Sequence, residues 1–474
     1  MHCHVFNLMA TFGKIVVFYN FKRTFTNNLR CTKIMKYLHS SLLICCGLVI
    51  SCFAQGQAKT DSSFTDATIA NCVQYALKHQ PLIQQSIIDE DITERQIQTH
   101  LSEWYPQVNL GYNFQHNFQL PTAYNAGSYI TTGTFNSSTI GLGATQAIFS
   151  QDLLLASRTA NDIRKQAKQT TASNKIDISV NVSKAFYDVL FTERQAEVLA
   201  QDTIRLAKSL KDSYNQYEGG IVDKTDYKRA TISLNNTRAQ LKQTHALVAA
   251  KYTYLKQLMG YPQNDSLSLQ YDTTQMVTDA IIDTNQLINY QDRIEYQQLE
   301  TEQRLLQSNL QYYKWSFLPT VSAYGNYNLG YLNNDFSKTY SQSFPNSNIG
   351  LSLSVPIFQG TKRIQELREA ELQLDRLNWD FTSLKDNINT QYQQALAIYK
   401  GNLADYLALK DNVQLANDVY NVIDLQYRSG IKTYLDVIVA ESDLRSAQLN
   451  YFNSLYQLLQ SKLDVEKALG TVQY

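Results

Sequence analysis

An apolar residue recurs at every seventh position in two separate stretches of this 474-residue chain. The first series is Tyr227, Leu234, Leu241, Val248 and Leu255, and the second is Val437, Leu444, Tyr451, Leu458 and Val465. A seven-residue repeat sustained over several turns predicts a helix that packs lengthwise against another helix, as in a left-handed coiled coil.

The same turn sequence precedes both series. It reads YEGGIVDKTDY at 217–227 and YRSGIKTYLDV at 427–437. Gly220 and Gly430 suit the left-handed backbone conformation that ends a helix. We therefore expect each turn to join two helices.

A long helical pattern without proline lies upstream of each turn, at 151–216 and 361–426. Each stretch would span roughly 100 Å at 1.5 Å per residue. Asp226 and Asp436 then fall in the first turn of the following helix, where a negative charge suits the helix dipole. The sequence predicts two long antiparallel helical hairpins.

Four shorter stretches alternate apolar and polar residues with the period of a β-strand. Val108, Leu110, Tyr112 and Phe114 share one face of the first stretch. The four predicted strands are 106–114, 139–149, 319–331 and 348–358. The chain is thus expected to contain two helix–strand–strand–helix–helix repeats, at 55–260 and 287–474. The linker between them, 261–286, contains SLSLQYD, a candidate short strand.

The apolar faces of these strands fit lipid better than a protein core. A soluble sandwich would need more strands and a second layer. Aromatic residues that suit a membrane-interface belt stand beside the strand ends: Trp104, Tyr105, Phe149, Trp315, Phe317 and Phe358. Four strands cannot close a barrel, so neighbouring subunits must complete it. Two chains would supply eight strands and three would supply twelve, and the pattern leaves this choice open.

The segments between paired strands, 115–137 and 328–347, are rich in Asn, Ser, Thr and Tyr. They lie away from the helices, so we expect them outside the cell. An epitope inserted near Asn125 or Asn346 should then be accessible on intact cells.

Residues 1–54 read as an upstream extension followed by a signal peptide. Met35 is the expected start, an apolar run follows it, and cleavage is expected after Ala54. A lipid on Cys52 is the alternative route of processing. Cleavage after Ala54 leaves Cys72 as the one remaining cysteine, so no intrachain disulfide is expected, and no basic stretch indicates nucleic acid.

The chain resembles the TolC-like outer-membrane efflux protein family. The resemblance is carried by the two turns and by ALKHQPL at 76–82, YPQVNLGYNF at 105–114 and VPIFQG at 355–360. It implies an α+β membrane protein, a homotrimer that shares a 12-stranded β-barrel continuous with a periplasmic helical tunnel. It also implies a passive outer-membrane exit duct for small toxic molecules or drugs, served by a periplasmic adaptor and a proton-driven inner-membrane pump.

The resemblance further implies a periplasmic gate formed by Asp226, Tyr427, Lys432 and Asp436. Lys432 stands where the family has Arg, and Val439 stands where it has a further Asp. The hairpin ends implied to contact the adaptor comprise Gly220, Ile221, Thr225, Gly430 and Ile431. The competing interpretation is that these are ordinary capping and surface residues.

No pattern indicates catalysis, a cofactor or a metal. The histidines after residue 54 are scattered, at His79, His100, His116 and His245. Three alternatives stay open at this level: an outer-membrane duct for type I protein secretion, an envelope coiled-coil protein without a pore, and a periplasmic enzyme. The amphipathic strands disfavour the second, and the missing site chemistry disfavours the third.

Overall fold

The structure, a computed structural model, describes residues 67–271 and 273–474. The expected start at Met35, the cleavage site after Ala54 and the alternative lipid on Cys52 lie outside these residues. The described elements are, in chain order, α3 (Ile69–His79), α4 (Pro81–Leu101), η1 (Ser102–Trp104), β1 (Gln107–His116), β2 (Thr122–Asn125), β3 (Ser128–Thr131), β4 (Asn136–Phe149), α5 (Gln151–Glu218), α6 (Lys224–Met259), α7 (Thr273–Asp279), η2 (Tyr290–Asp292), α8 (Ile294–Trp315), β5 (Thr320–Asn333), η3 (Phe336–Ser341), β6 (Ser343–Ser354), α9 (Lys362–Arg428) and α10 (Tyr434–Leu469).

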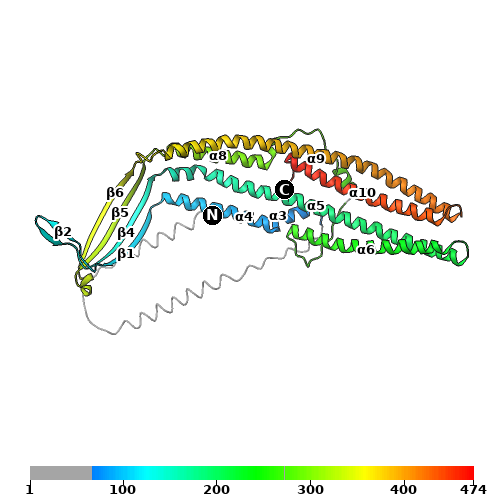
Figure 1. The fold of residues 1–474 in the computed structure, drawn as a ribbon, viewed down its shortest axis with the longest axis horizontal. Coiled ribbons are helices and arrows are strands. Elements are labelled where there is room, and N and C mark those ends of the chain that lie inside the picture. The colour runs from blue at the N-terminus through cyan, green and yellow to red at the C-terminus, as the bar shows by residue number, and fades with distance from the viewer. Residues whose placement is uncertain (1–66, 272) are drawn as a thin grey trace, which may run out of the picture. The chain divides into compact units, whose positions relative to one another are not determined.

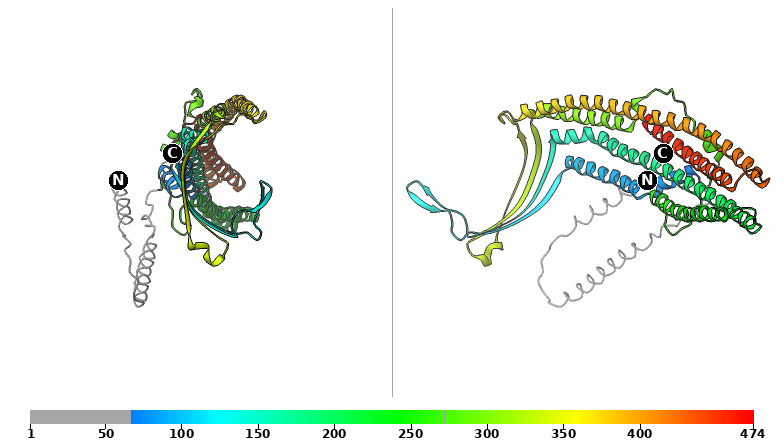
Figure 2. Two further views of the ribbon diagram at one scale, coloured as in Figure 1. Left: turned by 90° about the vertical axis from the view of Figure 1, so that its left-hand side faces the viewer. Right: turned by 45° about the vertical axis from the view of Figure 1, so that its right-hand side comes forward.

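The four long strands form one antiparallel sheet in the order β1-β4-β5-β6. Helices α4, α5, α8 and α9 extend away from one end of this sheet, and the hairpins α5–α6 and α9–α10 reach farthest from it (Figure 1). The turned views in Figure 2 show that the sheet is curved. Strands β1 and β6 are the edges, so each has one side without a partner among the residues that the structure describes.

All four predicted strands form, but their ends differ from the prediction. Strand β6 begins at Ser343 and ends at Ser354, earlier than the expected 348–358. Pro356 accounts for the early end, since proline has no N–H to donate to the ladder. Phe358 therefore lies beyond the strand.

The expected loop 115–137 contains a further hairpin, β2–β3. Ala126 and Gly127 form its turn, with φ of +46° and +91°. Two consecutive positive φ values give the twist that matches a two-residue β-hairpin. In the other expected loop, 328–347, strands β5 and β6 continue until only a short connection containing η3 remains.

The hairpin helices confirm the seven-residue repeat. In α10, Val437, Leu444, Leu458 and Val465 are each at most 3% exposed. In α6, Leu234 and Leu255 are equally buried. The repeat positions face α9 and α5 because antiparallel partners bury the shared apolar stripe.

Each hairpin returns to meet the start of its own half. Gly260 ends α6 with φ of +68°, and Gly470 ends α10 with φ of +77°. A Cβ at Gly260 would lie 2.6 Å from the carbonyl oxygen of His79, and one at Gly470 would lie 2.7 Å from that of Asp292. Only glycine fits both the backbone conformation and the close approach.

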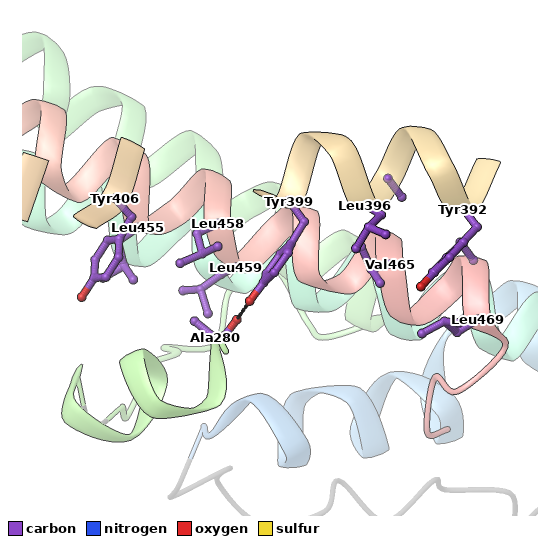
Figure 3. Packing of buried hydrophobic residues seen from close by; sticks show 12 residues of the cluster. Ala280, Tyr392, Leu396, Tyr399, Tyr406, Leu455, Leu458, Leu459, Val465 and Leu469 are labelled. Atoms are coloured by element: carbon purple, nitrogen blue, oxygen red, sulfur yellow. Dashed lines mark hydrogen bonds between the residues drawn. The ribbon is translucent and has the colours of Figure 1, made fainter. Parts of the chain in front are cut away.

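The linker 261–286 packs against α9 and α10 (Figure 3). The Tyr399 hydroxyl, fully buried, donates to the carbonyl oxygen of Ala280 at 3.0 Å and accepts from the N–H of Ile282 at 3.0 Å. In place of the candidate short strand in this linker, the described residues form one isolated β-bridge, between Ala67 and Leu269. Helix α7, which the sequence pattern did not predict, follows it.

None of the helices in the described ranges has both the length and the apolar composition needed to cross a lipid bilayer.

Candidate functional site

The two hairpin ends have the same backbone structure. In the first, the N–H of Ile221 donates to the carbonyl of Gln216, and the N–H of Gly220 donates to that of Tyr217. In the second, Ile431 bonds Gln426 and Gly430 bonds Tyr427. This paired arrangement is the Schellman motif, and it requires the positive φ that Gly220 and Gly430 adopt. The sequence prediction for both glycines is confirmed.

The second helix of each hairpin begins with a side-chain N-cap. Asp223 accepts from the N–H of Thr225 at 2.8 Å. Thr433 and Asp436 form a reciprocal capping box, in which the Asp436 carboxylate accepts from the Thr433 N–H at 2.9 Å. These bonds satisfy N–H groups that the helix itself leaves free. Sequence reasoning missed Thr433, although the spacing Thr-x-x-Asp was available to suggest it.

Three of the four expected gate residues lie at the second hairpin end. The Lys432 ammonium is 3.8 Å from the Asp436 carboxylate, and both side chains are partly exposed. Hydrogen bonds from the backbone N–H and the hydroxyl of Thr433 lower the pKa of Asp436, and the positive charge of Lys432 lowers it further. Lys432 and Asp436 therefore form an ion pair within one chain. An exposed ion pair of this kind contributes about 0–1 kcal/mol to stability.

Tyr427 joins the two hairpins. Its hydroxyl donates to Oε1 of Gln216 on α5 at 2.7 Å. Burial and the nearby charge of Asp226 raise its pKa, so the hydroxyl stays a donor at neutral pH. Asp226 is thus close enough to act on Tyr427 electrostatically, but the hydrogen bond goes to Gln216. Gln216 carries no motif that would have marked it in the sequence.

Four charged residues behind the hairpin ends form a cluster that the sequence pattern did not indicate. Asp202, fully buried on α5, accepts hydrogen bonds from Nη1 of Arg445 at 2.8 Å and from Nη2 of Arg205 at 3.1 Å. Glu441 on α10 is 2% exposed, and its carboxylate lies 3.5 Å from Nε of Arg205. Burial and the Asp202 charge raise the pKa of Glu441 to about 7, against the opposing effect of the two arginines.

The second cross-hairpin hydrogen bond lies between the cluster and the ends. The Ser209 hydroxyl on α5 and the Tyr434 hydroxyl on α10 are 3.0 Å apart. Tyr434 is buried with Ala230 and Val437 in a small apolar core beside Tyr427. Polar contacts therefore connect the two hairpins at three levels along their length.

The hairpin ends expose apolar side chains. Ile221 is 77% exposed and Ile431 is 72% exposed. Gly220, Thr225 and Gly430, the other residues expected to contact an adaptor, are also exposed. The two hairpin ends are therefore alike in exposure as well as in backbone structure, and their contact with an adaptor stays a prediction.

The six expected interface aromatics lie where helices meet strands. Tyr105, Phe317 and Phe358 are exposed, whereas Trp104, Phe149 and Trp315 are half-buried. The Trp104 indole donates to the Ser157 hydroxyl at 3.1 Å. Arg158 lies over the ring of Trp315, and Arg363 lies over that of Phe317. Within the described ranges, no three His, Cys, Asp or Glu side chains are grouped as for a metal ion.

Three relatives align over between 55% and 86% of the chain. Outer membrane protein TolC of Vibrio cholerae serotype O1 is 20% identical over 412 residues, which cover 85% of this chain and 91% of TolC. The probable efflux pump outer membrane protein TtgC of Pseudomonas putida is 22% identical over 417 residues, 86% of this chain and 84% of TtgC. The alkaline protease secretion protein AprF of Pseudomonas aeruginosa is 23% identical over 285 residues, 55% of this chain and 56% of AprF.

The fold is shared with a solved outer-membrane protein. The crystal structure of VceC from Vibrio cholerae superposes with a TM-score of 0.68 over 85% of this chain and 96% of VceC, at 14% identity. Residues 72–261 and 291–471 match the outer membrane efflux protein family. The chain therefore belongs to the outer membrane efflux protein family, and it is the outer-membrane exit duct of a tripartite efflux system.

Proposed function

We propose that three copies of the chain assemble into one 12-stranded barrel continuous with a periplasmic helical tunnel. The observation that carries this proposal is the sheet β1-β4-β5-β6, whose two edge strands have no outer partner within residues 67–271 and 273–474 of one chain. In hydrocarbon each unpaired backbone group costs several kcal/mol. The exposed apolar face, with Leu110 at 73% and Ile349 at 90%, supports placement in lipid. The repeats at 55–260 and 287–474 would each supply two of the four strands.

Oligomerisation should be obligatory for this reason. Native mass measurement in mild detergent is expected to give three processed chains, with no concentration-dependent monomer. A stable monomer that inserts into bilayers and conducts would contradict the shared barrel.

The cargo is proposed to be small toxic molecules or drugs, delivered by a periplasmic adaptor and a proton-driven inner-membrane pump. The alignment with the probable efflux pump outer membrane protein TtgC supports a role in efflux, and the exposed Ile221 and Ile431 would give the adaptor an apolar contact. Planar-bilayer conductance of the purified protein tests the duct itself. Deletion of the gene should increase the susceptibility of the cells to drugs.

Protein secretion is the second candidate, favoured by the alignment with AprF. The two candidate functions predict different phenotypes when the gene is deleted. A deletion strain that retains drug resistance but loses one secreted protein from its medium would favour this alternative.

The connections away from the helices should face outside the cell. An epitope inserted in the β2–β3 turn, near Asn125, is expected to be labelled on intact cells. The earlier candidate Asn346 is unsuitable, since it pairs with Asn328 within the sheet. An insertion after Ser337 in η3 replaces it, and an insertion in the 220–222 turn is the matched periplasmic control. Labelling of the Asn125 site only after permeabilisation would reverse the orientation.

The gate is also a proposal. Tyr427, Lys432, Asp436 and Asp226 would narrow the tunnel where three copies converge. Support comes from the bond between Tyr427 and α5 and from the ion pair of Lys432 with Asp436. Docking of partners would separate the two hairpins and open the passage.

A further inference from the structure

The sheet and its connections carry almost no formal charge. Residues 104–151 contain no Lys, Arg, Asp or Glu, and residues 315–361 contain only Asp335 and Lys338. Those two lie in the η3 connection and pair with each other, 3.5 Å apart. Charged residues make up 18% of the whole chain, so this absence distinguishes the sheet from the helices.

One face of the sheet is lined with side-chain amides. The strand register places Asn109, Gly143, Asn326 and Asn348 in one row across the sheet. The next row on the same face contains Gly111, Gly141, Asn328 and Asn346. We call these two rows the amide face.

The amides are ordered by each other and by the glycines beside them. Nδ2 of Asn326 donates to Oδ1 of Asn348 at 3.0 Å, and Nδ2 of Asn328 donates to Oδ1 of Asn346 at 3.1 Å. A Cβ at Gly141 would lie 2.3 Å from Oδ1 of Asn328. The glycines of β4 therefore leave the space over which the β5 amides lie.

The opposite face is apolar and strongly exposed. Leu110, Leu142, Leu351 and Leu353 all belong to it, and each is at least 49% exposed. Because lipid takes the apolar face of a membrane sheet, the amide face is left for the interior.

We propose that the amide face lines the lumen of the assembled barrel and passes polar cargo of either charge without selecting between them. This inference rests on the proposed closed barrel. An amide offers both donors and acceptors, so it can replace water around a cation or an anion. Selectivity in pores commonly comes from rings of charged side chains, and neither row of the amide face supplies one.

Reversal potentials in planar bilayers under a salt gradient test the neutrality. The wild-type duct should prefer cations because of Asp436. In Asp436→Asn, which keeps an oxygen for the cap, the ratio of potassium to chloride permeability should fall. Adding Asn328→Asp to that variant should restore cation preference, and adding Asn328→Lys should invert it. Asn348→Asp and Asn348→Lys repeat the test on β6, in case a charge at residue 328 prevents assembly.

Thiol labelling tests which face of the sheet is exposed to water in the assembled barrel. Asn328→Cys should react with a charged methanethiosulfonate reagent and lose conductance, whereas the neighbouring Leu329→Cys, on the apolar face, should not. The chain processed after Ala54 is a suitable background, since it retains one cysteine, Cys72, whose buried thiol has its pKa raised to about 12. Blocking through Leu329→Cys alone would overturn the assignment of the amide face to the lumen. A conducting Asp436→Asn in which neither Asn328→Asp nor Asn328→Lys changes the permeability ratio would overturn the proposal while leaving the duct intact. A wild-type protein that never conducts would refute the duct and this inference together.

Discussion

Single-channel conductance should rise when Tyr427→Phe and Lys432→Ala are combined, while the protein keeps its oligomeric state. Tyr427→Phe removes only the hydroxyl that bonds Gln216, and leaves the ring beside Tyr434. A neutral hydrogen bond contributes about 1 kcal/mol. Three copies would lose roughly 3 kcal/mol from the closed state, which corresponds to about a hundredfold shift toward the open state.

Lys432→Ala adds a smaller effect. Its ion pair with Asp436 is partly exposed and screened by salt, so it contributes about 0–1 kcal/mol per chain. The matched control is Arg428→Ala, one residue from Tyr427. Arg428 pairs with Asp424 on its own helix at 2.7 Å, so its loss should leave the conductance unchanged. A double variant that remains trimeric but conducts like the wild type would show that these residues are not the latch.

The buried charge cluster should make the stability of the hairpins depend on pH. The pKa of Glu441 is raised to about 7 in the folded protein, whereas an unfolded glutamate titrates near 4.3. The folded state therefore holds this proton more tightly. The stabilisation of the folded state by this proton is fully present below about pH 4.3, declines as the pH rises, and is lost above about pH 7.

Glu441→Gln should remove this dependence. Over that pH range the wild type should lose up to roughly 4 kcal/mol of unfolding free energy through this one group, whereas the variant should not. Above pH 7 the variant should be the more stable protein. Thermal unfolding of the detergent-solubilised protein, followed by circular dichroism at several pH values, measures both effects. Glu371→Gln, at an exposed position on α9, is the control. Parallel curves for wild type and Glu441→Gln would contradict the assignment.

Arg205→Met should destabilise the same cluster at every pH. It leaves Asp202 and Glu441 close together with Arg445 as the remaining cation, and breaking a buried pair from one side costs about 3–5 kcal/mol. Arg205 is partly exposed, so the low end of this range is expected. Arg376→Met, which breaks an exposed pair with Asp380, should shift the unfolding free energy by less than about 0.5 kcal/mol.

Local pattern predicted the elements that depend on nearby residues. The seven-residue repeat ending at Leu255 and Val465 identified the hairpin helices, and Gly220 and Gly430 identified the ends. Alternation such as Val108, Leu110 and Tyr112 identified the strands. These signals are reliable because each depends on the backbone geometry of a few consecutive residues.

Strand ends and added elements were predicted less well. β6 ends before Pro356 instead of continuing to Phe358, and α7 and the β2–β3 hairpin were not anticipated. The end of β6 follows from Pro356 and the β2–β3 hairpin from its two-residue turn, local signals that the alternation of apolar residues did not reveal, whereas α7 depends on its neighbours. The bonds of Tyr399 to residues 280 and 282, for example, hold the linker after α7 against α9.

The sequence by itself determined that this chain has two similar halves, each with a helical hairpin and two amphipathic strands. It also determined the family and its function as a duct, through the turns and the strand motifs. Only the tertiary structure decided that Asn326 and Asn328 lie over the glycines of β4 and bond β6, and that Asp202 meets Arg445 from the other half of the chain. Such pairs join residues far apart in sequence, and no periodic pattern encodes them, because their geometry depends on strand register and on how the helices pack.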